Sequence, residues 1–216
     1  MTDIDPHADE PIATAGAPPE AAEAAVVLLH GRGDSPAGIL RLVDDLYHRG
    51  VRYIAPAAAG RVWYPGTFTD PLTERREAFL GSALDRVTAT LDVARDVGVT
   101  AERVVLVGFS QGAAVALEYA TRHPRRYGGV AALAGGLLGP TGDLTPPAGS
   151  LAGTQAFCGV GVDDPHVPVA HVEASGRVLD GMGATTTVET YPGLGHAIND
   201  DEFAAVNRLI AAVAPE

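Results

Sequence analysis

A serine flanked by glycines carries the clearest chemical signal in the chain. Gly108, Ser110 and Gly112 form a GxSxG pattern between a short apolar run, residues 104–107, and an alanine-rich segment. The run is typical of a buried strand and the segment of a helix, so Ser110 is expected at a strand-to-helix corner. Small neighbours leave room for that sharp turn and expose the hydroxyl. The pattern indicates a nucleophilic serine, although a tight turn with a serine that caps the helix could have the same sequence pattern.

A serine nucleophile needs an imidazole base, and the base needs an acceptor that fixes its tautomer. His196 is the best candidate, because it lies on a glycine-flanked loop after the last expected strand, where it can reach over the carboxyl edge of a sheet. The other six histidines are less suited by position. His7 lies in the amino-terminal segment, and His48 and His123 lie at expected helix ends. His30 precedes Ser110, and His166 and His171 lie close to the adjacent aspartates, residues 163 and 164.

The acid is expected between Ser110 and His196 in the chain, where Asp163 and Asp164 are adjacent. Neighbouring side chains in an extended chain point in nearly opposite directions, so only one of the pair can reach the imidazole. Pro165 keeps the preceding residue out of the helical region, which favours Asp164. Asp163 would then be a solvated carboxylate or a turn acceptor.

Acyl transfer also needs N–H donors for the developing oxyanion. The backbone N–H of Gln111, the first of the helix after the serine, is one candidate. The other is Arg32, whose HGRGD segment follows an expected strand at residues 24–29. A plain glycine-rich turn, with His30 at the strand end, is the alternative for that segment.

A long loop at residues 56–71 holds three of the chain's aromatic residues, Trp63, Tyr64 and Phe68. Long ordered loops are often functional. These rings either pack the loop onto the core or line an apolar substrate pocket, and we expect them, with Arg32, to contact the substrate.

Strands and helices alternate along the chain, which predicts an α/β fold with a mostly parallel sheet covered by helices on both faces. Residues 135–153 are too few for a large cap domain. The expected strands are residues 24–29, 51–55, 104–107, 129–134, 154–159 and 185–191. The expected helices are residues 39–49, 72–97, the segment from Gly112 to about 123, 169–182 and 200–213.

Composition limits the classes of protein and partner. Residues 1–22 are poor in large apolar side chains and are expected to form a disordered acidic tail, with residues 23–216 as one domain. The formal net charge is −12, and the chain has no lysine, so nucleic acid is not an expected partner. The acidity suggests adaptation to high salt, although a GC-rich genome would have the same effect on lysine.

The single cysteine, Cys158, excludes an internal disulfide, and no clustered Cys and His pattern indicates a metal site. The acidic amino terminus does not resemble a signal peptide, and no apolar run is long enough to span a membrane. A cytoplasmic location is therefore expected. The oligomeric state stays open, with a homodimer as one option.

Four segments together resemble the phospholipase/carboxylesterase family of α/β hydrolases, which includes acyl-protein thioesterases. They are HGRGD at residues 30–34, GFSQGA at 108–113, DPHVP at 164–168 and GLGH at 193–196. The resemblance implies an α/β-hydrolase fold, a triad of Ser110, Asp164 and His196, and an oxyanion hole formed by the N–H groups of Arg32 and Gln111. Many relatives have leucine where this chain has Arg32.

The expected function is therefore a cofactor-free serine hydrolase that cleaves small carboxylic esters or thioesters through an acyl-Ser110 intermediate. It would act as a carboxylesterase, lysophospholipase or thioesterase. A dienelactone-type hydrolase is an alternative, but those enzymes usually have cysteine at the strand-to-helix corner where this chain has Ser110. A non-catalytic binding module of the same fold is a second alternative, and it would be expected to lack one member of the triad.

Overall fold

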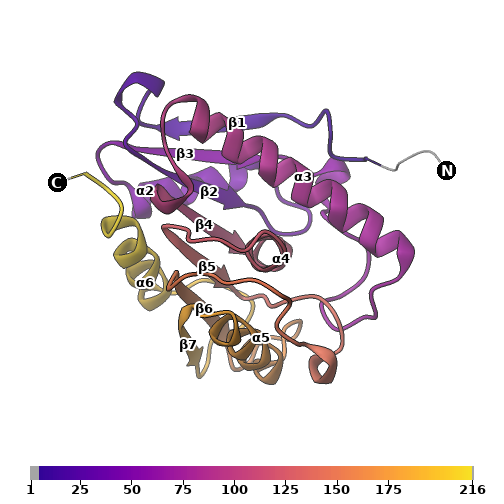
Figure 1. Ribbon diagram of the computed structural model, residues 1–216. Helices are drawn as coiled ribbons and strands as arrows, with labels where there is room; N and C mark the ends of the chain where they lie inside the picture. The colour runs from indigo at the N-terminus through magenta and orange to yellow at the C-terminus, as the bar shows by residue number, and fades with distance from the viewer. Residues whose placement is uncertain (1–4, 216) are drawn as a thin grey trace.

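Seven strands form a single sheet in the computed structural model, which describes residues 5–215 (Figure 1). The strand order is β1-β3-β2-β4-β5-β6-β7, and β1 is antiparallel to β3 while the other neighbours are parallel. The strands are β1 (Ile12–Gly16), β2 (Ala24–Leu29), β3 (Val51–Pro56), β4 (Val104–Phe109), β5 (Gly129–Leu133), β6 (Gln155–Gly161) and β7 (Thr185–Tyr191). The predicted mostly parallel sheet is confirmed.

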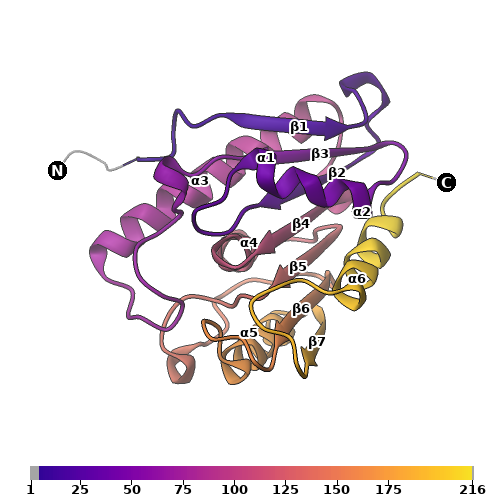
Figure 2. The same ribbon diagram turned by 180° about the vertical axis from the view of Figure 1, so that it is seen from behind.

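Helices cover both faces of the sheet. The first face is packed by α3 (Glu74–Asp96), α4 (Gln111–Arg122) and α5 (Val169–Gly181) (Figure 1). The opposite face is packed by α1 (Pro36–Ile39), α2 (Val43–Leu46) and α6 (Asp200–Ala211) (Figure 2). The strand β2 shows why the central strands are apolar throughout: alternate residues enter the two cores, and all six are buried.

The expected disordered tail is wrong for residues 5–22. The strand β1 pairs with the outer edge of β3, in a register that sets Ala13 opposite Ala55. Its small side chains bury little surface, so the backbone pairing supplied by β3 holds the segment. His7 is buried as well, with Nε2 at 3.0 Å from the Trp63 carbonyl. Residues 1–4 lie outside the described part of the chain.

One predicted helix is broken in the structure. In place of residues 39–49, the chain forms α1, a 3₁₀ turn over Leu40–Leu42 and then α2, which ends at Leu46. The apolar residues Ile39, Val43 and Leu46 still face the sheet, so the predicted spacing holds although the backbone hydrogen bonding changes. The other helices lie within a few residues of their predicted bounds.

The connection from β5 to β6 contains a single 3₁₀ turn over Thr141–Asp143, so no large cap covers the carboxyl edge of the sheet. None of the helices between residues 5 and 215 is long and apolar enough to cross a membrane.

Candidate active site

Ser110 lies on a strained corner between β4 and α4. Its φ of 55° and ψ of −119° fall in a region that non-glycine residues rarely adopt. Two glycines permit the close approach around it. A Cβ on Gly108 would lie 2.2 Å from the Gly112 carbonyl oxygen, and a Cβ on Gly112 would lie 2.0 Å from the Leu29 carbonyl oxygen. Both glycines of the GxSxG pattern are therefore required by contacts with backbone atoms.

A chain of hydrogen bonds connects Ser110 to two side chains distant in sequence. The Ser110 Oγ is 2.9 Å from His196 Nε2, and His196 Nδ1 is 2.7 Å from Asp164 Oδ2. A carboxylate only accepts, so Nδ1 carries the proton and Nε2 is free to accept one from the serine. The ring of Phe109 packs against the imidazole, with centroids 5.0 Å apart.

The backbone of its own loop holds the Asp164 carboxylate. The Oδ1 atom accepts hydrogen bonds from the N–H groups of His166, at 2.8 Å, and Val167, at 3.1 Å. The side chain of Asp164 is fully buried. Asp163 is exposed, and its backbone N–H donates to the Leu194 carbonyl. The structure thus brings Asp164, and not Asp163, to His196.

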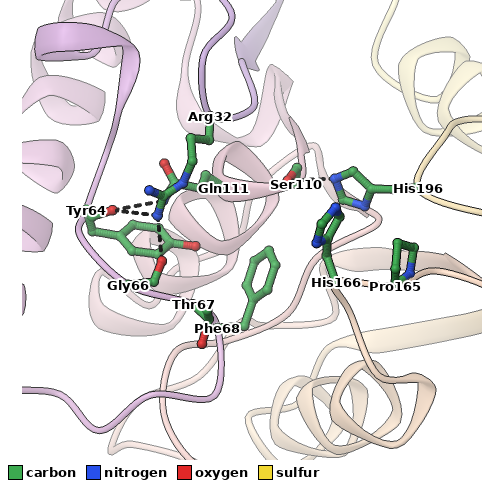
Figure 3. A pocket seen from close by; sticks show the side chains of 10 residues that line it. All are labelled: Arg32, Tyr64, Gly66, Thr67, Phe68, Ser110, Gln111, Pro165, His166 and His196. Carbon is green, nitrogen blue, oxygen red and sulfur yellow. Dashed lines mark hydrogen bonds between the residues drawn. The ribbon is translucent and has the colours of Figure 1, made fainter.

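The two residues expected to donate to an oxyanion both lie beside Ser110 and share a second structural role. The Gln111 side chain accepts from Trp63 N–H at 3.1 Å and donates to the Tyr64 carbonyl at 2.8 Å. The Arg32 guanidinium donates to the same carbonyl at 3.4 Å and to the Gly66 carbonyl at 2.5 Å (Figure 3). Their side chains therefore fix the loop that follows β3.

His30, whose HG sequence marks the end of β2, is buried. Its Nε2 accepts from Ala58 N–H at 3.2 Å, and its carbonyl accepts from the Trp63 indole at 2.8 Å. Burial lowers the pKa of His30, which keeps the ring neutral. The residue holds the loop onto the strand and does not reach the Ser110 hydroxyl.

A pocket of about 570 Å³ opens over Ser110 (Figure 3). Two of the three aromatic residues expected to bind substrate, Tyr64 and Phe68, lie in its wall. Trp63 does not, because its ring is buried between His7 and His30, so for Trp63 the core-packing interpretation is the correct one. The lining residues are Arg32, Tyr64, Gly66, Thr67, Phe68, Ser110, Gln111, Pro165, His166 and His196.

His166 lines the pocket, although its position in the sequence did not predict a role in the site. Its ring meets that of His196 edge to face, with centroids 5.0 Å apart. The signal was its position two residues after Asp164, since the turn that holds the carboxylate also turns this side chain toward the site. Cys158 is buried, and burial raises its thiol pKa to about 12, so it is not a competing nucleophile.

Comparisons with known proteins identify the family of the chain. Residues 11–214 match the phospholipase/carboxylesterase family. The acyl-protein thioesterase 1 of Gibberella zeae is 32% identical over 122 residues, which cover 56% of this chain and 52% of that protein. The chain thus spans about half the length of that relative. The esterase YpfH of Escherichia coli K12 is 29% identical over 194 residues, 85% of this chain and 80% of that protein.

The solved structures include a phospholipase/carboxylesterase from Dyadobacter fermentans with 38% identity and a TM-score of 0.87. The match covers 94% of this chain and 97% of that one. A family match across nearly the whole chain, together with this agreement in fold, shows that the chain belongs to the phospholipase/carboxylesterase family of α/β hydrolases.

Proposed function

We propose that this protein is a serine hydrolase that cleaves carboxylic esters or thioesters through an acyl-Ser110 intermediate. The observation that carries the proposal is the continuous hydrogen-bonded chain from Ser110 through His196 to Asp164, which opens onto a pocket. The esterase and thioesterase names of the relatives support the same reaction class.

The first half-reaction forms the acyl enzyme. His196 Nε2 takes the proton as Ser110 Oγ attacks the substrate carbonyl carbon, and Asp164 stabilises the imidazolium through Nδ1. The carbonyl oxygen becomes an oxyanion, which accepts from the backbone N–H groups of Arg32 and Gln111. Collapse breaks the bond to the leaving oxygen or sulfur, which receives the proton from Nε2.

The second half-reaction repeats this sequence with water as the nucleophile. Water gives a proton to His196, its oxygen attacks the acyl carbon, and Ser110 leaves with the proton returned. The products are a carboxylic acid and an alcohol or thiol. Loss of one oxyanion donor typically costs about 10²- to 10³-fold in kcat, so these N–H groups are a major part of the expected catalysis.

The alternatives are less well supported. A dienelactone-type hydrolase usually has cysteine as nucleophile, whereas this chain has Ser110 at the corner between β4 and α4. A binding module that had lost catalysis would not need a serine, an imidazole and a carboxylate in hydrogen-bond contact.

We also propose that the enzyme acts in the cytoplasm on a small-molecule ester or thioester, that it needs no cofactor, and that it does not bind nucleic acid. For its assembly, a homodimer is one option beside a monomer.

The test is labelling with an alkyl phosphonate probe, which reacts with activated serines. The wild-type chain should be labelled on Ser110 and should hydrolyse 4-nitrophenyl acetate, while Ser110→Ala should do neither and should keep its circular dichroism spectrum. The exposed Ser150, changed to alanine, is the matched control and should label normally. Labelling of Ser110→Ala would move the nucleophile elsewhere.

A further inference from the structure

The direction in which a substrate lies across Ser110 can be deduced from His196. Its Nε2 atom must give a proton to the leaving oxygen or sulfur, so the leaving group lies on the side of His196 and His166. The acyl group and the carbonyl oxygen then both lie away from His196. In Figure 3 that side of Ser110 is occupied by Arg32, Tyr64 and Phe68, which come from the loops after β2 and β3.

The acyl side of the pocket carries a positive charge with no protein counter-ion. Arg32 donates to two neutral carbonyls, those of Tyr64 and Gly66, and forms no salt bridge with a carboxylate in residues 5–215. These bonds hold the exposed guanidinium against the loop without pairing it with a carboxylate. The pocket lining contains no Asp or Glu side chain, although acidic residues outnumber basic ones by 27 to 15 in the chain.

A second polar group lies on the same wall. The Tyr64 hydroxyl is buried and has no hydrogen-bond partner among the described residues. A buried hydroxyl without a partner is costly in free energy. In Figure 3 the Tyr64 ring extends from the loop backbone toward Phe68 with this hydroxyl at its leading end. The charged Arg32 side chain makes this wall poorly suited to a purely hydrocarbon acyl chain.

We propose that the acyl group of the substrate ends in a carboxylate that is bound by Arg32, so that the preferred substrates are monoesters or monothioesters of short dicarboxylic acids. This inference rests on the proposed hydrolase function and adds the substrate class to it. A guanidinium fixed by two carbonyls pairs well with a carboxylate, because little side-chain freedom remains to be lost.

The experiment compares substrates that differ only in charge. Monomethyl esters of succinic, glutaric and adipic acid are each paired with the methyl ester whose far carboxylate is replaced by a carboxamide, and methanol release gives kcat/KM. The carboxamide has the same size and is polar but neutral. For at least one chain length we expect the carboxylate to be favoured by about tenfold or more. The preference should shrink as NaCl is added.

Variants assign the preference to one side chain. Arg32→Leu should reduce the carboxylate-to-carboxamide ratio to about one, whereas Arg32→Lys should retain part of it because the charge remains. Arg61→Leu is the matched control, since Arg61 is exposed and its carbonyl accepts from Gly33 N–H, yet its side chain does not line the pocket. Arg61→Leu removes the same charge and should leave the ratio unchanged.

Three outcomes would overturn the proposal. They are a wild-type ratio near one at every chain length, a ratio that persists in Arg32→Leu, and a ratio that falls equally in Arg61→Leu and Arg32→Leu. In each case phosphonate labelling of Ser110 and turnover of 4-nitrophenyl acetate would still support the hydrolase function. Loss of labelling and of all ester turnover in the wild-type chain would instead contradict the hydrolase function itself.

Discussion

His196 is held from both sides before any substrate arrives, and each of its ring nitrogens has one partner. Asp164 receives the Nδ1 proton and is itself fixed by two backbone N–H groups, so the acid cannot rotate away from the imidazole. The strain at Ser110 fits this picture. A non-glycine residue at positive φ costs on the order of 1–3 kcal/mol, and such strain is commonly found at functional sites.

The neighbouring aspartates offer a matched pair of variants. Asp164→Asn should lower kcat by on the order of 10³- to 10⁴-fold, because the amide no longer holds the imidazole in the tautomer that can accept the serine proton. Asp163→Asn should change kcat less than about tenfold, since that side chain is exposed. Both are to be measured on one activated ester at a single pH. The reverse ranking would assign the acid to Asp163.

Gln111 combines a proposed N–H donor with a side chain that holds the pocket loop. Gln111→Leu keeps the backbone donor but leaves Trp63 N–H and the Tyr64 carbonyl without their partner. We expect the free energy of unfolding to fall by about 1–3 kcal/mol and kcat/KM for short esters to fall as well. Gln111→Glu retains the acceptor for Trp63 and should retain part of the stability. Urea unfolding with steady-state kinetics measures both, and unchanged values for Gln111→Leu would contradict the anchoring role.

At this scale the sequence predicted the candidate site well, because each residue sits in a short local pattern. The structure brings Ser110, Asp164 and His196 into contact, as expected. The role of Trp63 could not be predicted, because the loop containing it folds back so that the indole reaches the His30 carbonyl, 33 residues away. No local pattern reports such a contact. His166 was missed for a related reason, since its direction depends on the turn around Asp164.

Among the elements, the parallel strands were the easiest to predict and the amino-terminal strand was missed. The strands β2 and β7 begin and end at the predicted residues, because their apolar or β-branched runs end at clear turn residues. The strand β1 is short, and apart from the β-branched Ile12 and Thr14 it consists of alanine and glycine. It is ordered by the backbone edge that β3 presents and by the burial of His7. A strand that is ordered mainly by pairing with another strand is difficult to predict from its own sequence.

The helix α6, which follows His196, begins with a reciprocal capping box that contains a buried carboxyl group. The Asn199 side chain accepts from Glu202 N–H at 2.9 Å, and Glu202 Oε2 accepts from Asn199 N–H at 3.0 Å. The other carboxyl oxygen of Glu202 is buried and has no hydrogen-bond partner within residues 5–215. Burial raises the pKa of Glu202 from 4.5 to about 7.

This shift predicts how the stability depends on pH. Between about pH 4.5 and 7 the folded state binds more protons at Glu202 than the unfolded state, so the free energy of unfolding should fall as the pH rises through that range. Glu202→Gln keeps the capping acceptor and removes the titration. It should flatten the curve by on the order of 1–2 kcal/mol between pH 4.5 and 8.

The control for Glu202 is Glu173→Gln on α5, where the carboxylate is exposed. Urea unfolding at several pH values measures the effect in both variants. A slope that is the same for Glu202→Gln and the wild-type chain would show that this group titrates alike in the folded and unfolded states.

For the whole molecule, the dominant electrostatic feature is the excess of acid. The net charge is −12, and every basic side chain apart from histidine is arginine. Ion pairs offset little of this charge: within residues 5–215 they are Arg95 with Asp92 and Arg122 with Glu77 and Glu118. Most surface carboxylates therefore repel one another without a local partner, which destabilises the compact state. The proposed positive acyl side of the pocket is a local exception to this field.

We therefore expect salt to stabilise the fold. Screening acts on exposed charges over a Debye length of about 10 Å at 0.1 M and about 3 Å at 1 M salt, so the melting temperature should rise most steeply below about 0.3 M NaCl.

Changing the exposed residues Glu20, Glu23 and Glu173 to glutamine reduces the excess negative charge, so that the net charge goes from −12 to −9. The triple variant should melt higher than the wild-type chain in dilute buffer, and its melting temperature should rise less with salt. A stabilisation that is instead linear up to molar salt and equal in both proteins would reflect salt exclusion from the surface. Maximal stability of the wild-type chain in dilute buffer would contradict adaptation to high salt.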